Sequence, residues 1–187
     1  MTREEALALL DKHLKTSNLK RHCFAVEAVM RALARRFDKD EEKWGLVGLL
    51  HDGDYEETRD TPEFHTIKMV EWLKKEGVTD KEVIGAILSH NFAHTGQNPP
   101  KNLLEWSLYC CDELTGFIVA CALVRPDASL ASVNIEFMEK KWKEKSFAAG
   151  VNRQQIQECE GRLKIPLREF MQIALSAMQG ISQDLGL

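Results

Sequence analysis

The segment Trp44-Gly45-Leu46-Val47-Gly48-Leu49-Leu50-His51-Asp52-Gly53-Asp54 combines an apolar run with a His-Asp pair. The apolar part predicts a buried helix that runs from about Asp40 to His51 and is stopped by Gly53. His51 and Asp52 are therefore adjacent at the end of a very apolar helix. The segment predicts polar chemistry at the edge of a helical core.

Helical periodicity continues on both sides of this segment, and no segment shows the alternation typical of a strand. We therefore expect an all-α protein. Two capping-box patterns, Thr2-x-x-Glu5 and Thr79-x-x-Glu82, mark helix starts. The other expected helices cover residues 17–37, 61–77, 103–124, 129–145, 152–163 and 166–183, and the helix that starts at Thr79 reaches about residue 90.

Composition limits the class of protein. The chain has 187 residues, a net charge of −4, 44% hydrophobic and 29% charged residues, which is typical of a globular protein. Its mild acidity argues against a dedicated nucleic-acid binder. No apolar run approaches the ~18 residues that a membrane span needs, and Met1–Glu5 does not resemble a secretory signal. We expect a cytoplasmic protein with no membrane partner.

The cysteines and histidines differ in what they predict. The five cysteines form no C-x-x-C pair and lie in apolar stretches, so we expect reduced core residues and no thiolate zinc site. Five of the six histidines, in contrast, fall between positions 22 and 94. The histidines are therefore the better candidates for a site.

Several of these histidines share apolar helix faces with buried positions, and so do two aspartates. His22 lies between Leu19 and Val26 at helical spacing, and Asp112 lies on the apolar stripe of the 103–124 helix. A lone histidine on such a face is more often a hydrogen-bonded core residue, and a single His-Asp pair is weak evidence. The joint set is more specific, because a buried carboxylate is costly unless it is paired or bound to a metal. A divalent cation would explain the whole set, which comprises His22, His51, Asp52, His65, His90 and Asp112.

The order His22, His51-Asp52, Asp112 resembles the HD superfamily of metal-dependent phosphohydrolases over about residues 17–125. This resemblance implies an HD-domain-like helical bundle, here a single domain with a C-terminal helical extension at about 129–187. It also implies that His22, His51, Asp52 and Asp112 bind one divalent metal. Thr115, one helical turn after Asp112, is placed to support the ligands.

The additional His65 and His90 resemble the subset of this superfamily that holds two metals. In that arrangement Asp52 bridges the ions and the two histidines bind the second one. The chain departs from many hydrolases of the group at Tyr55, where they have a glutamate. This leaves the general acid or base open between Asp54 and Glu56, of which we expect Asp54 to accept or relay a proton, although a solvated loop or cap acid is the alternative reading.

Imidazole and carboxylate ligands without thiolates suit Mn, Fe, Co, Ni, Mg or Zn, with one or two ions per chain. We therefore expect a metal-dependent phosphohydrolase that uses metal-activated water on a nucleotide or another small phosphate ester. Two alternatives stay open at this point. One is a two-iron oxygenase of the same superfamily, and the other is a non-catalytic module that binds metal or nucleotide.

The sequence says less about substrate and partners. Six cations could meet a phosphate, although each is more typical of a solvated surface: Lys20, Arg21, Lys68, Arg125, Lys145 and Arg153. The basic run 140–145 could cover a phosphate site or touch nucleic acid, but a helix face with Trp142 packed inward is the simpler reading. His94 is a weaker ligand candidate, and His13 is expected to be structural or exposed. The apolar stripe at 165–175 could pack within the chain or form a homodimer.

Overall fold

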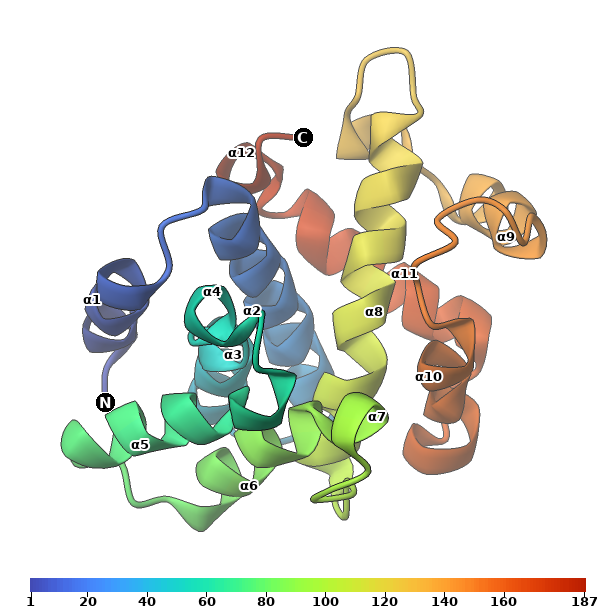
Figure 1. The fold of residues 1–187 in the computed structure, drawn as a ribbon. Helices are drawn as coiled ribbons and strands as arrows, with labels where there is room; N and C mark the ends of the chain where they lie inside the picture. The colour runs from blue at the N-terminus through green and yellow to red at the C-terminus, as the bar shows by residue number, and fades with distance from the viewer.

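The structure is a computed structural model that describes residues 1–187, and it consists of helices without a strand, which confirms the all-α prediction (Figure 1). Helix α8 stands between the N-terminal helices on one side and α9 and α10 on the other. The elements in chain order are α1 (Arg3–His13), α2 (Ser17–Phe37), α3 (Glu41–Leu50), α4 (Tyr55–Thr58), η1 (Pro62–Phe64), α5 (Ile67–Lys75), α6 (Lys81–His90), α7 (Phe92–Thr95), α8 (Leu103–Leu123), η2 (Leu130–Ser132), α9 (Ile135–Lys143), α10 (Arg153–Glu158), η3 (Cys159–Leu163), α11 (Leu167–Gln179) and α12 (Ser182–Leu185).

Helices α2 and α3 make the closest helix pair. A Cβ atom added to Gly48 would lie only 2.9 Å from backbone atoms of Val26 and Glu27, so only glycine allows the two backbones to approach this far. The predicted stripe of α2 is buried at Cys23, Val26 and further along the helix. This contact fixes the N-terminal half of α2 against the end of α3.

Helix α8 is the central core helix, with thirteen buried residues along its length. It is also long and apolar enough to cross a membrane by length and composition alone, which corrects the expectation that no segment approaches this limit. The sequence conceals this because Glu105, Asp112 and Glu113 interrupt the apolar run. Its most apolar window is 61% buried inside the protein, as expected for a core helix.

The expectation of a single helix over residues 61–77 is wrong, because the helical conformation is interrupted at Thr66. Thr66 has φ 71°, a left-handed conformation that ends the short η1 turn before α5 begins. The side-chain amide of Asn91 donates to the carbonyl oxygens of Pro62 (2.8 Å) and His65 (3.4 Å), which a continuous helix would use internally. This break sets the position of His65.

The helix starts are predicted with mixed success. Thr2 and Glu5 form the expected capping box, but α6 is capped by Asp80, whose side chain accepts from the N–H of Glu82, and not by Thr79. The short helices α4 and α7 were not expected. The expected helix 129–145 is divided into η2 and α9 because Asn134 caps a new start, and the helices expected at 152–163 and 166–183 are divided into α10 with η3 and α11 with α12.

The C-terminal helices share the core of the N-terminal ones. One hydrophobic cluster extends from Ala6 to Leu185, and α11 packs against both α2 and α8. In the apolar stripe at 165–175, Phe170, Met171 and Leu175 are buried within the chain. The five cysteines are free and buried, as predicted.

Candidate metal centre

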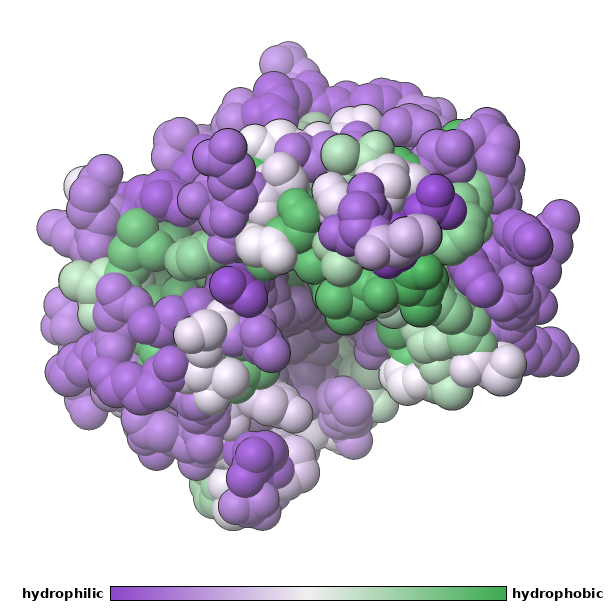
Figure 2. Space-filling model, turned by 90° about the horizontal axis from the view of Figure 1, so that it is seen from above, coloured by the Kyte–Doolittle hydropathy of each residue, from purple (hydrophilic) through white to green (hydrophobic).

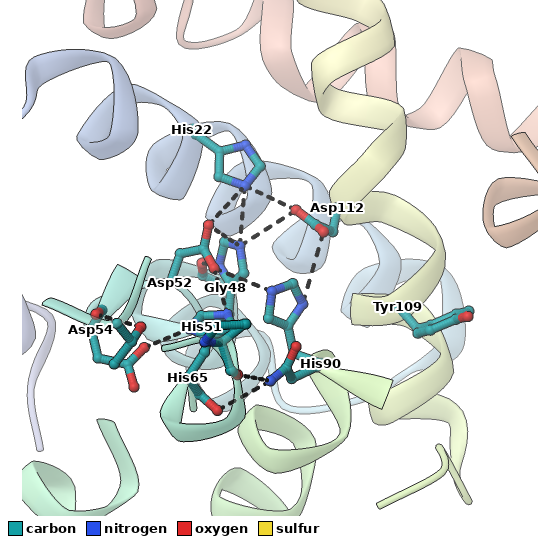
Figure 3. A network of polar contacts seen from close by, with 12 residues as sticks. His22, Gly48, His51, Asp52, Asp54, His65, His90, Tyr109 and Asp112 are labelled. Carbon is teal, nitrogen blue, oxygen red and sulfur yellow. Dashed lines mark hydrogen bonds and ion pairs between the residues drawn. The ribbon is translucent and has the colours of Figure 1, made fainter. Parts of the chain in front are cut away.

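The four histidines and two aspartates that the sequence predicts as a site lie together at one point of the fold (Figure 3). They come from separate elements, because α2, α3, α6 and α8 all end or pass there. The set comprises His22 on α2, His51 and Asp52 directly after α3, His65 between η1 and α5, His90 at the end of α6, and Asp112 on α8. Packing of distant helices therefore assembles the cluster.

One group of donors forms around His22, His51 and Asp112. The Nε2 atom of His22 lies 2.9 Å from Oδ1 of Asp112 and 3.2 Å from Nε2 of His51. The same Oδ1 of Asp112 lies 3.5 Å from Nε2 of His51. These three residues offer ligand atoms close enough together to hold one metal ion.

Asp52 connects this group to a second one. Its Oδ2 atom lies 3.6 Å from Nε2 of His22 and 3.7 Å from Nε2 of His51. Its Oδ1 atom lies 3.2 Å from Nε2 of both His65 and His90. The two oxygens of one carboxylate thus face two different sets of imidazoles.

Three of the four rings are oriented by an oxygen on their far side. The Nδ1 atom of His51 donates to the carbonyl oxygen of Gly48 (2.7 Å). The hydroxyl of Thr115 donates to the carbonyl of Asp112, so its oxygen can accept from Nδ1 of His22 at 3.3 Å. In a neutral ring with the proton on Nδ1 in each of these bonds, Nε2 would present a lone pair to the cluster, as a metal ligand requires.

Asp54 orients the ring of His65. Its Oδ1 atom lies 2.8 Å from Nδ1 of His65, and its Oδ2 atom accepts the backbone N–H of Met69 at 3.0 Å. The side chain has no exposed surface. Asp54 is therefore not a solvated acid, although it does accept the N–H of Met69 in the first turn of α5, as a cap acid does. Glu56, the other acid considered, points away and binds the backbone N–H groups of Lys15 and Thr16.

The electrostatics of the cluster favour a bound cation. Burial lowers the pKa of His22, but the hydrogen bond and charge of Asp112 outweigh it and raise the pKa to about 9. Burial also lowers the pKa of His65, but the hydrogen bonds and charges of Asp52 and Asp54 outweigh it and raise the pKa to about 9. The pKa of Asp52 and Asp112 is lowered against the effect of burial by the neighbouring histidines. Neither carboxylate forms an ion pair with a lysine or arginine.

His90 supplies a direct test of whether a metal fits. Its Nδ1 atom is buried and has no hydrogen-bond partner, and it lies 3.8 Å from Oδ2 of Asp112. An unpaired buried nitrogen is costly unless something binds it. A divalent ion accepts imidazole nitrogen and carboxylate oxygen together, so the donor set fits such an ion.

A cavity of about 410 Å³ opens above the cluster. Its floor includes His22, Asp52, His65, His90 and Asp112, and its walls come from α4, α7, α8 and α10. None of the six cations considered from the sequence lines this cavity. The cation that does line it is Arg59, which directly follows α4. Sequence pattern gave no signal for Arg59, because α4 is too short to show a period.

The six cations considered from the sequence have other surroundings. Lys20 pairs with Asp11, Lys68 pairs with Glu57, and Arg153 donates to four backbone carbonyls. Arg125 lies over the ring of Phe137 and Lys145 is exposed. Arg21 lines a neighbouring groove instead.

The structure also shows the surroundings of Trp142, His13 and His94. Trp142 is half-buried against Phe117, as expected for an inward face. His13 stacks on Trp72 at 3.6 Å between ring centroids and is structural. His94 is exposed on the wall of the cavity and stands outside both donor groups.

Comparison with known proteins gives one finding. The family model of the HD domain matches residues 19–121, which is more than half of the chain. No curated protein and no solved structure matches the chain.

Proposed function

Because the chain belongs to the HD domain family, whose members are generally metal-dependent phosphohydrolases, we propose that it hydrolyses a small phosphate ester with divalent metal ions. One observation carries the most weight. The two oxygens of Asp52 face different imidazoles, Oδ2 those of His22 and His51 and Oδ1 those of His65 and His90, each within 3.7 Å. A carboxylate between two cations is typical of two-metal sites that act on phosphate esters.

The residues fall into two sets of ligands around Asp52. His22, His51 and Asp112, whose ligand atoms lie close enough to hold one ion, would bind the first ion. His65 and His90, whose Nε2 atoms both face Oδ1 of Asp52, would bind the second. Ions bound there supply a water of lowered pKa and neutralise charge on the phosphoryl oxygens. Asp52 is shared by both sets. We therefore propose two ions per chain.

The other residues of the centre hold it in shape and select the ligand. Gly48, Thr115 and Asp54 orient the imidazoles of His51, His22 and His65. For Asp54 this replaces the proton relay expected from the sequence, because both of its oxygens are already engaged and water has no access to it. Arg59, on the cavity wall, would pair with a phosphate oxygen.

The test combines metal analysis with assays. Gently purified protein is analysed for metal, then assayed with added Mn, Co, Ni or Mg on a panel of nucleotides and other phosphate esters. We expect metal-dependent release of phosphate by the native chain and its loss in His51→Ala and Asp112→Ala. His13→Ala, a histidine outside the cavity, is the matched control and is expected to retain activity. Activity that persists in both cluster variants would refute the assignment.

The same preparation separates the alternatives. A stable mixed-valence iron spectrum after anaerobic purification, without phosphate release, would indicate oxygenase chemistry. Tight nucleotide binding with no product under any metal would indicate a sensing module. Either result would contradict a phosphohydrolase.

A further inference from the structure

A second cavity, of about 360 Å³, adjoins the metal centre. It lies between the N-terminal half of α2, the C-terminal half of α8 and residues 185–187, and we call it the α2–α8 groove. These segments lie at the top of Figure 1, and the view from above in Figure 2 shows a hollow with apolar surface along one side. The α2–α8 groove shares His22 and Gly116 with the cavity over the cluster, so the two spaces meet at a candidate metal ligand.

The lining of the α2–α8 groove is more apolar than that of the cavity above the cluster. Its walls combine the apolar side chains of Ala25, Val119, Leu123, Leu185 and Leu187 with the polar ones of Asn18, Arg21 and Thr115, and its exposed lining is mainly apolar. Leu123 is 59% exposed, and an apolar ligand group that covered it would remove this surface from water. The chemistry of this lining favours an apolar ligand group.

Gly116 marks the place where the two spaces meet. It lies in the middle of α8, where glycine destabilises a helix relative to alanine. Packing does not demand it, because the nearest atom to an added Cβ is a methyl carbon of Val151 at 4.0 Å. Gly48, in contrast, is required by backbone atoms at 2.9 Å. Because Gly116 has no side chain, we infer that nothing separates the α2–α8 groove from the cavity above the cluster at this point.

We propose that the substrate is an amphiphilic phosphate ester whose phosphate lies at the metal centre and whose apolar group lies in the α2–α8 groove. This inference rests on the proposed phosphohydrolase activity and adds the substrate class to it. Gly116 and Leu123 are seven residues apart, about 10 Å along the helix axis, and this distance sets the length of the apolar group. The volume of the groove lies within the usual range of pockets for small molecules.

The experiment compares methyl, butyl and octyl phosphate. Binding is measured by calorimetry with and without added Mn, and hydrolysis is measured by phosphate release. For the native chain we expect affinity to rise about fourfold with each methylene that enters the groove, in both metal states. In Gly116→Leu the rise of affinity with chain length is expected to disappear, so that the octyl ester binds no more tightly than methyl phosphate. Leu123→Gln, at the exposed far end, is expected to weaken only the octyl ester.

A matched control guards against effects on folding. Gly161→Leu replaces an exposed glycine outside both cavities and is expected to keep the full dependence on chain length. Hydrolysis of all three esters with equal KM would overturn the amphiphilic substrate and leave the proposed function intact. Binding that depends on chain length without hydrolysis of any ester would refute the proposed function and retain the groove as a ligand site. A dimer that Leu123→Gln dissociates would overturn the inference, because the groove would then be an interface.

Discussion

The carboxylate of Asp54 lies 2.8 Å from Nδ1 of His65, whose Nε2 atom lies 3.2 Å from the carboxylate of Asp52. The imidazole is thus held between a fully buried carboxylate and the one that faces both donor groups. Such a partner fixes the tautomer and the orientation of a ligand ring. Asp54 therefore acts on the proposed second ion through His65.

Asp54→Asn should damage the second metal position and spare the first. The new amide can still accept from Met69 through its oxygen, but its NH₂ group then faces Nδ1 of His65. The ring avoids this by moving its proton to Nε2, which removes the lone pair offered to a metal. We expect affinity for the second ion to fall about 10–100-fold, as measured by metal titration with two resolved steps.

Asp60→Asn is the matched control for this substitution. Asp60 is a nearby aspartate whose side chain is 92% exposed, and its loss should leave both titration steps unchanged. An Asp54→Asn protein that retains its fold and binds both ions like the native chain would show that the hydrogen bond has no such role.

Much of the fold could be predicted from residue pattern. Buried positions recur at helical spacing along the whole of α2 and α8, and segments of this length leave little ambiguity between helix and strand. The inward positions of His22 and Asp112 followed from the same spacing. A pattern of this kind reports which face of a helix is buried, and this was enough to bring two donors to the core.

The remaining features depend on tertiary contacts that leave no local signal. The break at Thr66 results from a left-handed residue and from bonds to Asn91, 25 residues further along the chain. The burial of Asp54 depends on Met69 in another helix, and Arg59 follows a helix of four residues. Hydrophobic periodicity cannot reveal contacts that are made by single residues in short turns.

Gly48→Ala should separate α2 from α3 and disturb the first donor group. The added methyl would meet backbone atoms of Val26 and Glu27 at 2.9 Å, and backbone cannot yield as a flexible side chain can. We expect the free energy of unfolding to fall by about 1–3 kcal/mol in urea denaturation. Metal affinity should fall too, because His22 and His51 sit on the two helices that move apart.

The control for this change is Gly161→Ala, where an added Cβ meets nothing within 4 Å. It should leave stability unchanged or raise it slightly. If Gly48→Ala were as stable as the native chain, the close approach of the two helices would not depend on glycine.

Arg59→Ala tests the only lysine or arginine that lines the cavity above the cluster. Its side chain is 70% exposed, so its removal should not affect folding. Loss of a charged hydrogen bond to phosphate should raise KM roughly tenfold with little change in kcat or in metal content. Arg36→Ala, which removes an exposed arginine paired with Glu169, should leave KM unchanged. An unchanged KM in Arg59→Ala would mean that the phosphate is held by other groups.

Removal of the metal should leave a protein whose stability falls as pH rises. In the metal-free fold the pKa of His22 and of His65 is about 9, against an ordinary value of 6.5. Between these values the folded chain binds more protons than the unfolded chain, so the stabilisation is complete below about pH 6.5 and is lost as pH rises through 9. The lowered pKa of Asp52 and Asp112 acts only at acid pH and does not alter this window.

Urea denaturation in the presence of a chelator at pH 6.5 and pH 9 measures this loss, which we expect to be on the order of a few kcal/mol. His22→Gln should reduce the difference, because one of the two groups no longer titrates. Added Mn should reverse the trend, since the ion displaces both protons and binds more tightly as pH rises towards 9. If the metal-free protein became more stable between pH 6.5 and pH 9, the imidazoles of His22 and His65 would not be charged in the folded chain. Protons and metal would then not compete at this centre.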